Sequence, residues 1–189
     1  MNLKRLTAGL AVLLVMSATT GRAEEEFFHS RDYGSYIPEE TLVDADGDGK
    51  VADLVLASGT SRQLGSTTTH SVLEWSGDSV LSRCPNGNPG FQSQFVAGSA
   101  VIHTEHGDLL LIRFDKGTTC IDSATNTAGI KLAGTVVGGT GRFANAKGTV
   151  EIHGIAIPEV AFDESGLILL SSVDAETTGV IKTPNRVGG

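Results

Sequence analysis

A glycine-dense stretch at 136–148, Val-Val-Gly-Gly-Thr-Gly-Arg-Phe-Ala-Asn-Ala-Lys-Gly, constrains the fold of this chain more than any other feature. Four of its residues are glycine, and Phe143 is its one aromatic residue. Such backbone can bend sharply and pack closely before it re-enters a strand. The runs on either side, 129–137 and 149–157, alternate as β-strands do. The stretch therefore predicts a tight connection between two strands.

A glycine turn after a strand can also hold a phosphate group at the start of a helix, as in dinucleotide-binding folds. A parallel βαβ unit needs a crossover of a dozen or more residues. Here Gly148 and the next strand-like run follow within a few residues of Gly141, which leaves no room for a crossover helix. The spacing argues against a nucleotide site.

Further strand-like runs recur along the chain, and none has helical spacing. They lie at 54–57, 67–75, 92–96, 99–105, 109–114, 118–121 and 167–181. Turns rich in Gly, Pro, Asn and Asp separate them. Short strands joined by short turns indicate an antiparallel sheet, and closure into a barrel leaves no unpaired edge. An immunoglobulin-like sandwich is the alternative, because strand count does not separate the two folds.

The segment Gly138–Gly148 resembles the G-G-T-G-[RK]-F-x-x-A-x-G segment of the allene oxide cyclase and dirigent-protein barrel superfamily. More loosely, Ala57–Thr60 and Glu74–Trp75 resemble secreted bacterial members of that superfamily. The resemblance implies an all-β fold, a single antiparallel β-barrel of roughly eight strands. It also implies two unlike functions, cofactor-free cyclisation and the holding of an apolar intermediate, and homo-oligomers as a further expectation. The catalytic acids of those families lie outside the glycine segment, so none is assigned here.

Residues 1–23 have the pattern of a cleaved signal peptide. Lys4 and Arg5 precede an apolar run at 6–16, and residues 21–23, Gly-Arg-Ala, place small residues at the cleavage positions. The apolar run is too short to cross a bilayer, and a retained anchor is the alternative. We therefore expect a secreted or periplasmic protein.

Export would place the two cysteines, Cys84 and Cys120, in an oxidising compartment. We expect a disulfide between them, with two buried free thiols as the alternative. The formal net charge of −8 becomes more negative when the basic leader is removed. An acidic surface repels phosphate backbones and anionic lipids, so the sequence argues against nucleic-acid and membrane binding.

An acidic loop at 44–53 is the strongest chemical motif in the chain. Alternating carboxylates followed by glycine can converge on a calcium ion, which prefers hard oxygen ligands. The expected ligands are Asp44, Asp46, Asp48, Lys50 (through its carbonyl) and Asp53. The twelfth position is Val55 where an EF-hand has glutamate, so the loop resembles those of integrin-type propellers instead. The alternative is an acidic turn without metal.

The region between the leader and the acidic loop, 24–43, mixes aromatic and charged residues without clean periodicity. We expect it to form a short N-terminal arm that docks on the barrel, or a mobile terminus. The barrel domain is then expected at 44–189, with the acidic loop at its start.

Two strands each carry a histidine and a glutamate two residues apart, His103 with Glu105 and His153 with Glu151. Residues at this spacing face the same side of a strand. If that side faces the interior, the glutamates could act as general acid–base groups, while the histidines and Arg113 orient a ligand oxygen. The alternative is a cross-strand charge pattern that faces solvent, as is usual for exposed sheets.

The sequence has no zinc spacing, nucleophile elbow, phosphate loop or nicotinamide fingerprint, so calcium is the one cofactor expected. The favoured function is a secreted barrel, stabilised by calcium, that binds a small apolar molecule or a protein partner. Its polar pairs have a solvent-facing explanation, and small barrels can be filled by their own side chains. The alternative is a cofactor-free isomerase or cyclase that acts on a small apolar substrate inside the barrel.

Overall fold

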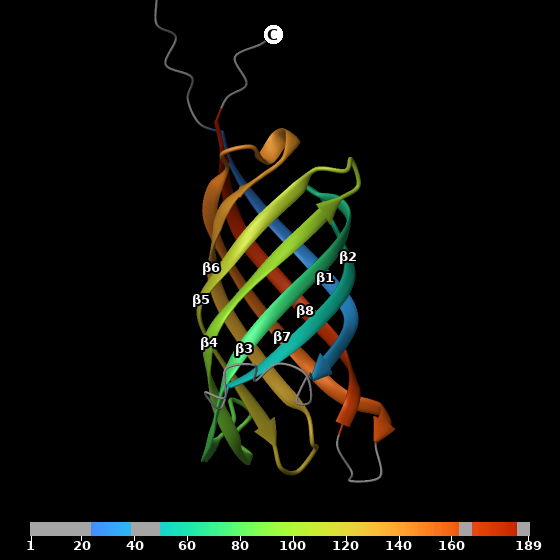
Figure 1. The fold of residues 1–189 in the computed structure, drawn as a ribbon, viewed down its shortest axis with the longest axis vertical. Helices are drawn as coiled ribbons and strands as arrows, with labels where there is room; N and C mark the ends of the chain where they lie inside the picture. Colours follow the sequence, from blue (N-terminus) through green and yellow to red (C-terminus); the bar gives the residue numbers. More distant parts are fainter. Residues whose placement is uncertain (1–23, 39–49, 163–167, 185–189) are drawn as a thin grey trace, which may run out of the picture.

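The computed structural model describes residues 24–38, 50–162 and 168–184. Its strands are β1 (Glu24–Pro38), β2 (Lys50–Ser61), β3 (Gly65–Arg83), β4 (Pro89–Thr104), β5 (Leu109–Asp122), β6 (Ala128–Gly139), β7 (Lys147–Phe162) and β8 (Ile168–Thr183). Each strand pairs antiparallel with the next, and β1 also pairs with β8, which closes the barrel (Figure 1). The prediction of an all-β, eight-stranded antiparallel barrel is confirmed, and the sandwich is excluded.

Strand β1 corrects one expectation. Residues 24–38, assigned to a peripheral arm, are part of the barrel wall, paired with β2 on one side and β8 on the other. The inward positions of β1 include Ser30 and Asp32, so the strand lacks the apolar alternation that would mark it in the sequence. Its backbone partners on β8 come from the other end of the chain, and closure of the sheet is what makes it a strand.

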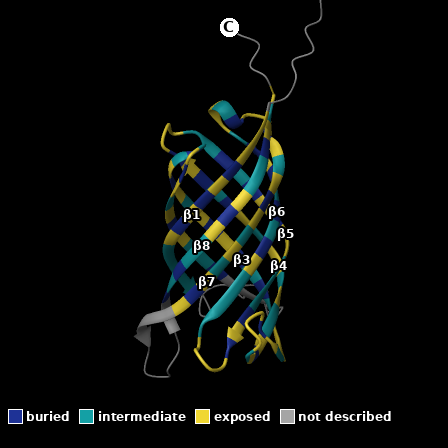
Figure 2. Cartoon of the chain, turned by 180° about the vertical axis from the view of Figure 1, so that it is seen from behind, coloured by how far each residue is buried: buried dark blue, intermediate teal, exposed yellow. Residues whose placement is uncertain are grey.

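The core follows from alternation along the other strands, visible as alternating dark blue and yellow bands in Figure 2. Inward positions in β4, β5 and β7 carry Ile102, Ile112 and Val150, all buried. These side chains belong to one apolar cluster that also contains Trp75 and Phe114. Strands β1 and β8 contribute Phe28 and Ile181 to this cluster, and their other buried positions include Ser30, Asp32, Ser171 and Thr177.

The glycine stretch closes one end of the barrel with the short 3-10 turn η1 (Gly141–Phe143). Phe143 is only 1% exposed, and the Arg142 guanidinium lies 4.7 Å above its ring. A Cβ atom at Gly139 would collide with the Leu109 carbonyl, and one at Gly148 with the carbonyl of Val180. The glycines therefore allow close strand contact on both sides of an aromatic plug.

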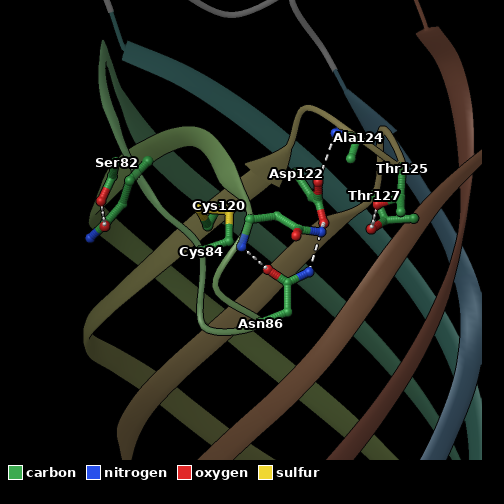
Figure 3. The surroundings of a disulfide bond; sticks show 10 residues. Ser82, Cys84, Asn86, Cys120, Asp122, Ala124, Thr125 and Thr127 are labelled. Atoms are coloured by element: carbon green, nitrogen blue, oxygen red, sulfur yellow. Dashed lines mark hydrogen bonds between the residues drawn. A yellow bond between two sulfur atoms is a disulfide. The ribbon is translucent and has the colours of Figure 1, made fainter.

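At the opposite end, β3 to β6 extend beyond the paired part of β2. Lys50, the first residue of β2, lies opposite Ser76, so the last part of β3 has no β2 partner within the described chain. Cys84 and Cys120 form a disulfide that joins the tip of the β3–β4 hairpin to β5, which confirms the predicted pairing (Figure 3). We call this extension the flared end.

Several predictions concern residues that the structure does not describe, namely the signal peptide at 1–23 and the carboxylates at Asp44, Asp46 and Asp48. Across the described ranges, the structure contains no helix that is both long and apolar enough to span a membrane.

Candidate functional site

The five side chains predicted as an acid–base group lie on the outer surface. His103, Glu105, Arg113, Glu151 and His153 are all exposed. His153 Nε2 is 3.9 Å from Glu151 Oε2, and Arg113 donates to Asp115 at 3.0 Å. One His/Glu pair lies at the end of β4, with Glu105 in the turn just after it, and the other lies on β7; β4 and β7 are not neighbours in the barrel, so the pairs do not converge.

The interior placement that the acid–base hypothesis required is therefore wrong for these residues. The inward positions of the same strands hold Ile102 and Thr104 on β4 and Val150 on β7, all buried. Burial favours the more apolar face of each strand, and the charged face is left to solvent. The charged pattern has the cross-strand character of an exposed sheet.

The closed interior instead contains a buried carboxylate that the sequence analysis missed. Asp32 on β1 accepts hydrogen bonds from the hydroxyls of Ser30 (2.8 Å), Thr177 (3.3 Å) and Thr67 (3.4 Å). Gly59 on β2 makes room for it, because a Cβ atom there would collide with the Asp32 carboxylate. Hydroxyl residues and a glycine at inward strand positions were the available signal.

Asp32 borders an internal cavity of about 50 Å³ whose other walls include Phe114, Leu132 and Ile152. Small-molecule sites are several times larger, on the order of 300–1,000 Å³. A space of this size holds a few water molecules at most. The closed part of the barrel is thus packed, and its carboxylate is satisfied by three hydroxyl groups.

The flared end presents the clearest unsatisfied apolar surface. Leu81, Phe91 and Ile121 are 76%, 47% and 41% exposed, and they lie directly opposite one another on β3, β4 and β5. Phe91 is four residues from Phe95 on β4 and shares its inward face, where Phe95 packs edge-on against Trp75 at 5.5 Å. We call Leu81, Phe91 and Ile121 the apolar row.

This row was missed because residues 76–91, which include Leu81 and Phe91, were assigned to turns between strands. Its signals were the apolar residues Leu81 and Phe91 on either side of the Pro-Asn-Gly turn. The hairpin is longer than that interpretation allowed, because β3 runs to Arg83 and β4 starts at Pro89.

The wall that carries the row is held by the disulfide and by Asp122 (Figure 3). The buried Asp122 carboxylate accepts hydrogen bonds from Asn88 Nδ2 (2.8 Å), Asn86 Nδ2 (2.6 Å) and the Ala124 backbone N–H (2.7 Å). These donors lower the pKa of Asp122 to about 2. Asp122 therefore stays ionised at neutral and mildly acidic pH and ties the β3–β4 hairpin to the β5–β6 turn.

Two of the predicted calcium ligands fall within the described ranges. Lys50 begins β2, and Asp53, three residues later, is a buried residue of the same strand. Among the residues that the structure describes, no group of three or more His, Cys, Asp or Glu side chains is placed to hold a metal ion. The other three ligands lie outside those residues, and the calcium loop stays a prediction.

No protein-family model matches the chain, and no curated protein sequence matches it. Among solved structures, it is similar to a pterocarpan synthase dirigent protein, with 12% sequence identity, a TM-score of 0.42, and coverage of 88% of this chain and 90% of that chain. We take no function from this similarity.

Proposed function

We propose that this protein is a binding barrel that holds a small apolar molecule against the apolar row at its flared end. The observation that supports this proposal is the exposure of Leu81, Phe91 and Ile121 on a face that continues the inner wall of the barrel. A contiguous exposed apolar surface on a soluble protein typically marks a binding site.

The energetics favour a ligand at this place. Covering apolar surface stabilises a complex by about 25 cal/mol per Å² removed from water. The wall is already ordered by the Cys84–Cys120 disulfide and by the hydrogen bonds to Asp122, so little conformational entropy is lost on binding. A preformed wall of this kind suits a small ligand.

Catalysis finds less support. The carboxylates first proposed as acid–base groups, Glu105 and Glu151, are exposed on the outside. The buried carboxylate Asp32 borders the interior cavity, and that cavity of about 50 Å³ is too small for a substrate. Binding is therefore the function that we derive from the site.

A fluorescence titration with N-phenyl-1-naphthylamine tests the proposal. We expect the probe to bind the native protein and to quench Trp75, the one tryptophan of the chain, by energy transfer. The Phe91→Ser variant should bind the probe at least about tenfold more weakly, because it lacks the aromatic surface that the probe covers. Val72→Ser is the matched control, since Val72 is an exposed apolar residue on the outer face of β3.

Two results would contradict this proposal. One is equal affinity of the native protein and Phe91→Ser, which would place the probe elsewhere. The other is no binding by the native protein, which would show that the apolar row does not hold a small apolar molecule of this kind.

We further propose that the protein works outside the reducing cytosol. The Cys84–Cys120 disulfide supports this location, because such bonds persist in secreted and periplasmic proteins. The leader-like pattern at 1–23 is consistent with export.

The acidic loop at 44–53 is proposed to bind calcium and to stabilise the start of β2. We expect the melting temperature to rise when millimolar Ca²⁺ is added, since a ligand at about 100 times its dissociation constant adds about 2.7 kcal/mol of stability. Differential scanning calorimetry of the native protein and Asp46→Ala, with Ca²⁺ or with a chelator, measures this. The Asp46→Ala variant should have the same melting temperature with Ca²⁺ and with the chelator. If the native protein does too, the loop does not bind calcium.

A further inference from the structure

The outer face of the barrel carries a groove that is lined by both polar and apolar groups and is separate from the apolar row. It has a volume of about 1000 Å³ and crosses the outward faces of β5, β6, β7, β8 and β1, with the β3–β4 hairpin tip as one wall. Its lining includes the Cys84–Cys120 disulfide, Gly129 and Ile155. A Cβ atom at Gly129 would meet nothing closer than 3.9 Å, so this glycine leaves open space in the groove. The groove and the apolar row lie on opposite faces of the β5 wall.

The acidic side chains of the groove already have partners. Asp174 accepts two hydrogen bonds from the Arg31 guanidinium, at 2.9 Å and 3.2 Å, which lower the pKa of Asp174 and raise that of Arg31. Glu176 Oε1 lies 2.7 Å from His29 Nε2. Asp122 is buried beneath the amides of Asn86 and Asn88.

Two cations in the groove lack such a partner. Within the described residues, Lys131 has no carboxylate within salt-bridge distance, and Arg83 donates only to the neutral carbonyl of Gly87, at 3.0 Å. Lys131 also lies directly opposite His153 in the β6–β7 register, and the carboxylate of Glu151 lies 3.9 Å from His153 Nε2. Basic groups in directly opposed positions do not stabilise each other. An anion bound between the two side chains would stabilise them.

From this arrangement we propose that the groove binds an organic carboxylate with an apolar body. The carboxylate accepts hydrogen bonds from Lys131 or Arg83, which are charge-assisted and therefore strong. The apolar body lies over Gly129 and against Ile155, whose side chain is half exposed. The chain as a whole, with a formal net charge of −8, repels anions, so Lys131 and Arg83 would provide the local positive charge that holds the carboxylate.

This site is separate from the proposed apolar site, and an experiment can distinguish them. Isothermal titration with octanoate and with its neutral analogue octanamide compares ligands of equal apolar length. We expect octanoate to bind more tightly than octanamide. Added salt should weaken octanoate binding, because salt screens the ion pair.

The variants locate the ligand. Lys131→Gln or Arg83→Gln should lower octanoate affinity about tenfold, the loss expected for one charge-assisted contact, without changing octanamide affinity. Lys147→Gln removes the same charge at an exposed position outside the groove and should leave octanoate binding unchanged. Circular dichroism checks that each variant is folded.

Three outcomes would overturn the inference. Octanoate does not bind at millimolar concentration; or it binds no better than octanamide; or Phe91→Ser removes its binding while Lys131→Gln and Arg83→Gln do not. The last result would place octanoate on the apolar row and would leave the proposed function standing. In the same way, a failure of the naphthylamine probe to bind the apolar row would leave the proposal for the groove standing.

Discussion

Replacement of Phe143 with alanine is expected to lower the free energy of unfolding by about 3–5 kcal/mol, the usual cost of removing a buried aromatic side chain. Phe143 is 1% exposed and belongs to the apolar core cluster together with Leu64, Leu110 and Ala146. The side chain occupies the barrel end where η1 connects β6 to β7. Alanine would leave a cavity there, because the flanking glycines hold the backbone in close strand contact and limit collapse.

Urea unfolding followed by circular dichroism measures this effect. Phe27→Ala is the matched control, because Phe27 is the same residue type but is 70% exposed on β1. Substitutions at such surface positions usually change stability by about 0.5 kcal/mol or less. A loss for Phe143→Ala no larger than that for Phe27→Ala would show that the ring is not a structural plug.

Removal of the disulfide is the second large effect that we expect. The bond links residues 36 positions apart in sequence. On the chain-entropy model, a loop of that length stabilises the folded state by roughly 3–4 kcal/mol. The double variant Cys84→Ser with Cys120→Ser should therefore unfold at a clearly lower urea concentration than the native protein.

A reductant supplies the internal control. Dithiothreitol should shift the unfolding midpoint of the native protein toward that of the double variant and leave the double variant unchanged. If the reductant does not change the unfolding midpoint of the native protein, under conditions where mass spectrometry shows free thiols, the prediction is contradicted. Because the disulfide also orders the wall that carries Phe91, we expect the double variant to bind the naphthylamine probe more weakly.

The two stability predictions differ in how far sequence reasoning could reach them. Phe143 was recognisable because a single aromatic residue among glycines is a local pattern, and its role depends on backbone that bends within a few residues. The cysteine pairing was predicted from compartment and number, and the structure supplied the geometry. The location of that bond on the flared end depended on the length of the β3–β4 hairpin, which turn signals alone understated.

The facing of the charged strands required the tertiary structure. Both faces of the run at 99–105 carry apolar residues, so alternation alone does not say whether His103 or Ile102 is inside. Bulges complicate the pattern further. Asp115 and Lys116 are consecutive and both exposed, and the β5–β6 register shifts between Phe114 and Lys116. From that point the inward residues of β5 are the odd-numbered ones, which brings Ile121 into the apolar row.

What the sequence determined by itself was local: antiparallel strands, the tight glycine connection, whose resemblance to a known barrel superfamily favoured a barrel, and the acidity of the chain. What only the tertiary structure decided was long-range. Strand β1 belongs to the wall because β8 closes onto it, and Asp32 is buried because hydroxyls from β1, β3 and β8 meet around it. The β1–β8 pairing and the Thr177–Asp32 hydrogen bond join residues more than a hundred positions apart, and a backbone hydrogen bond or a buried carboxylate leaves no local periodicity to detect. Closure of the sheet therefore decides which faces become interior, and hence where a ligand can bind.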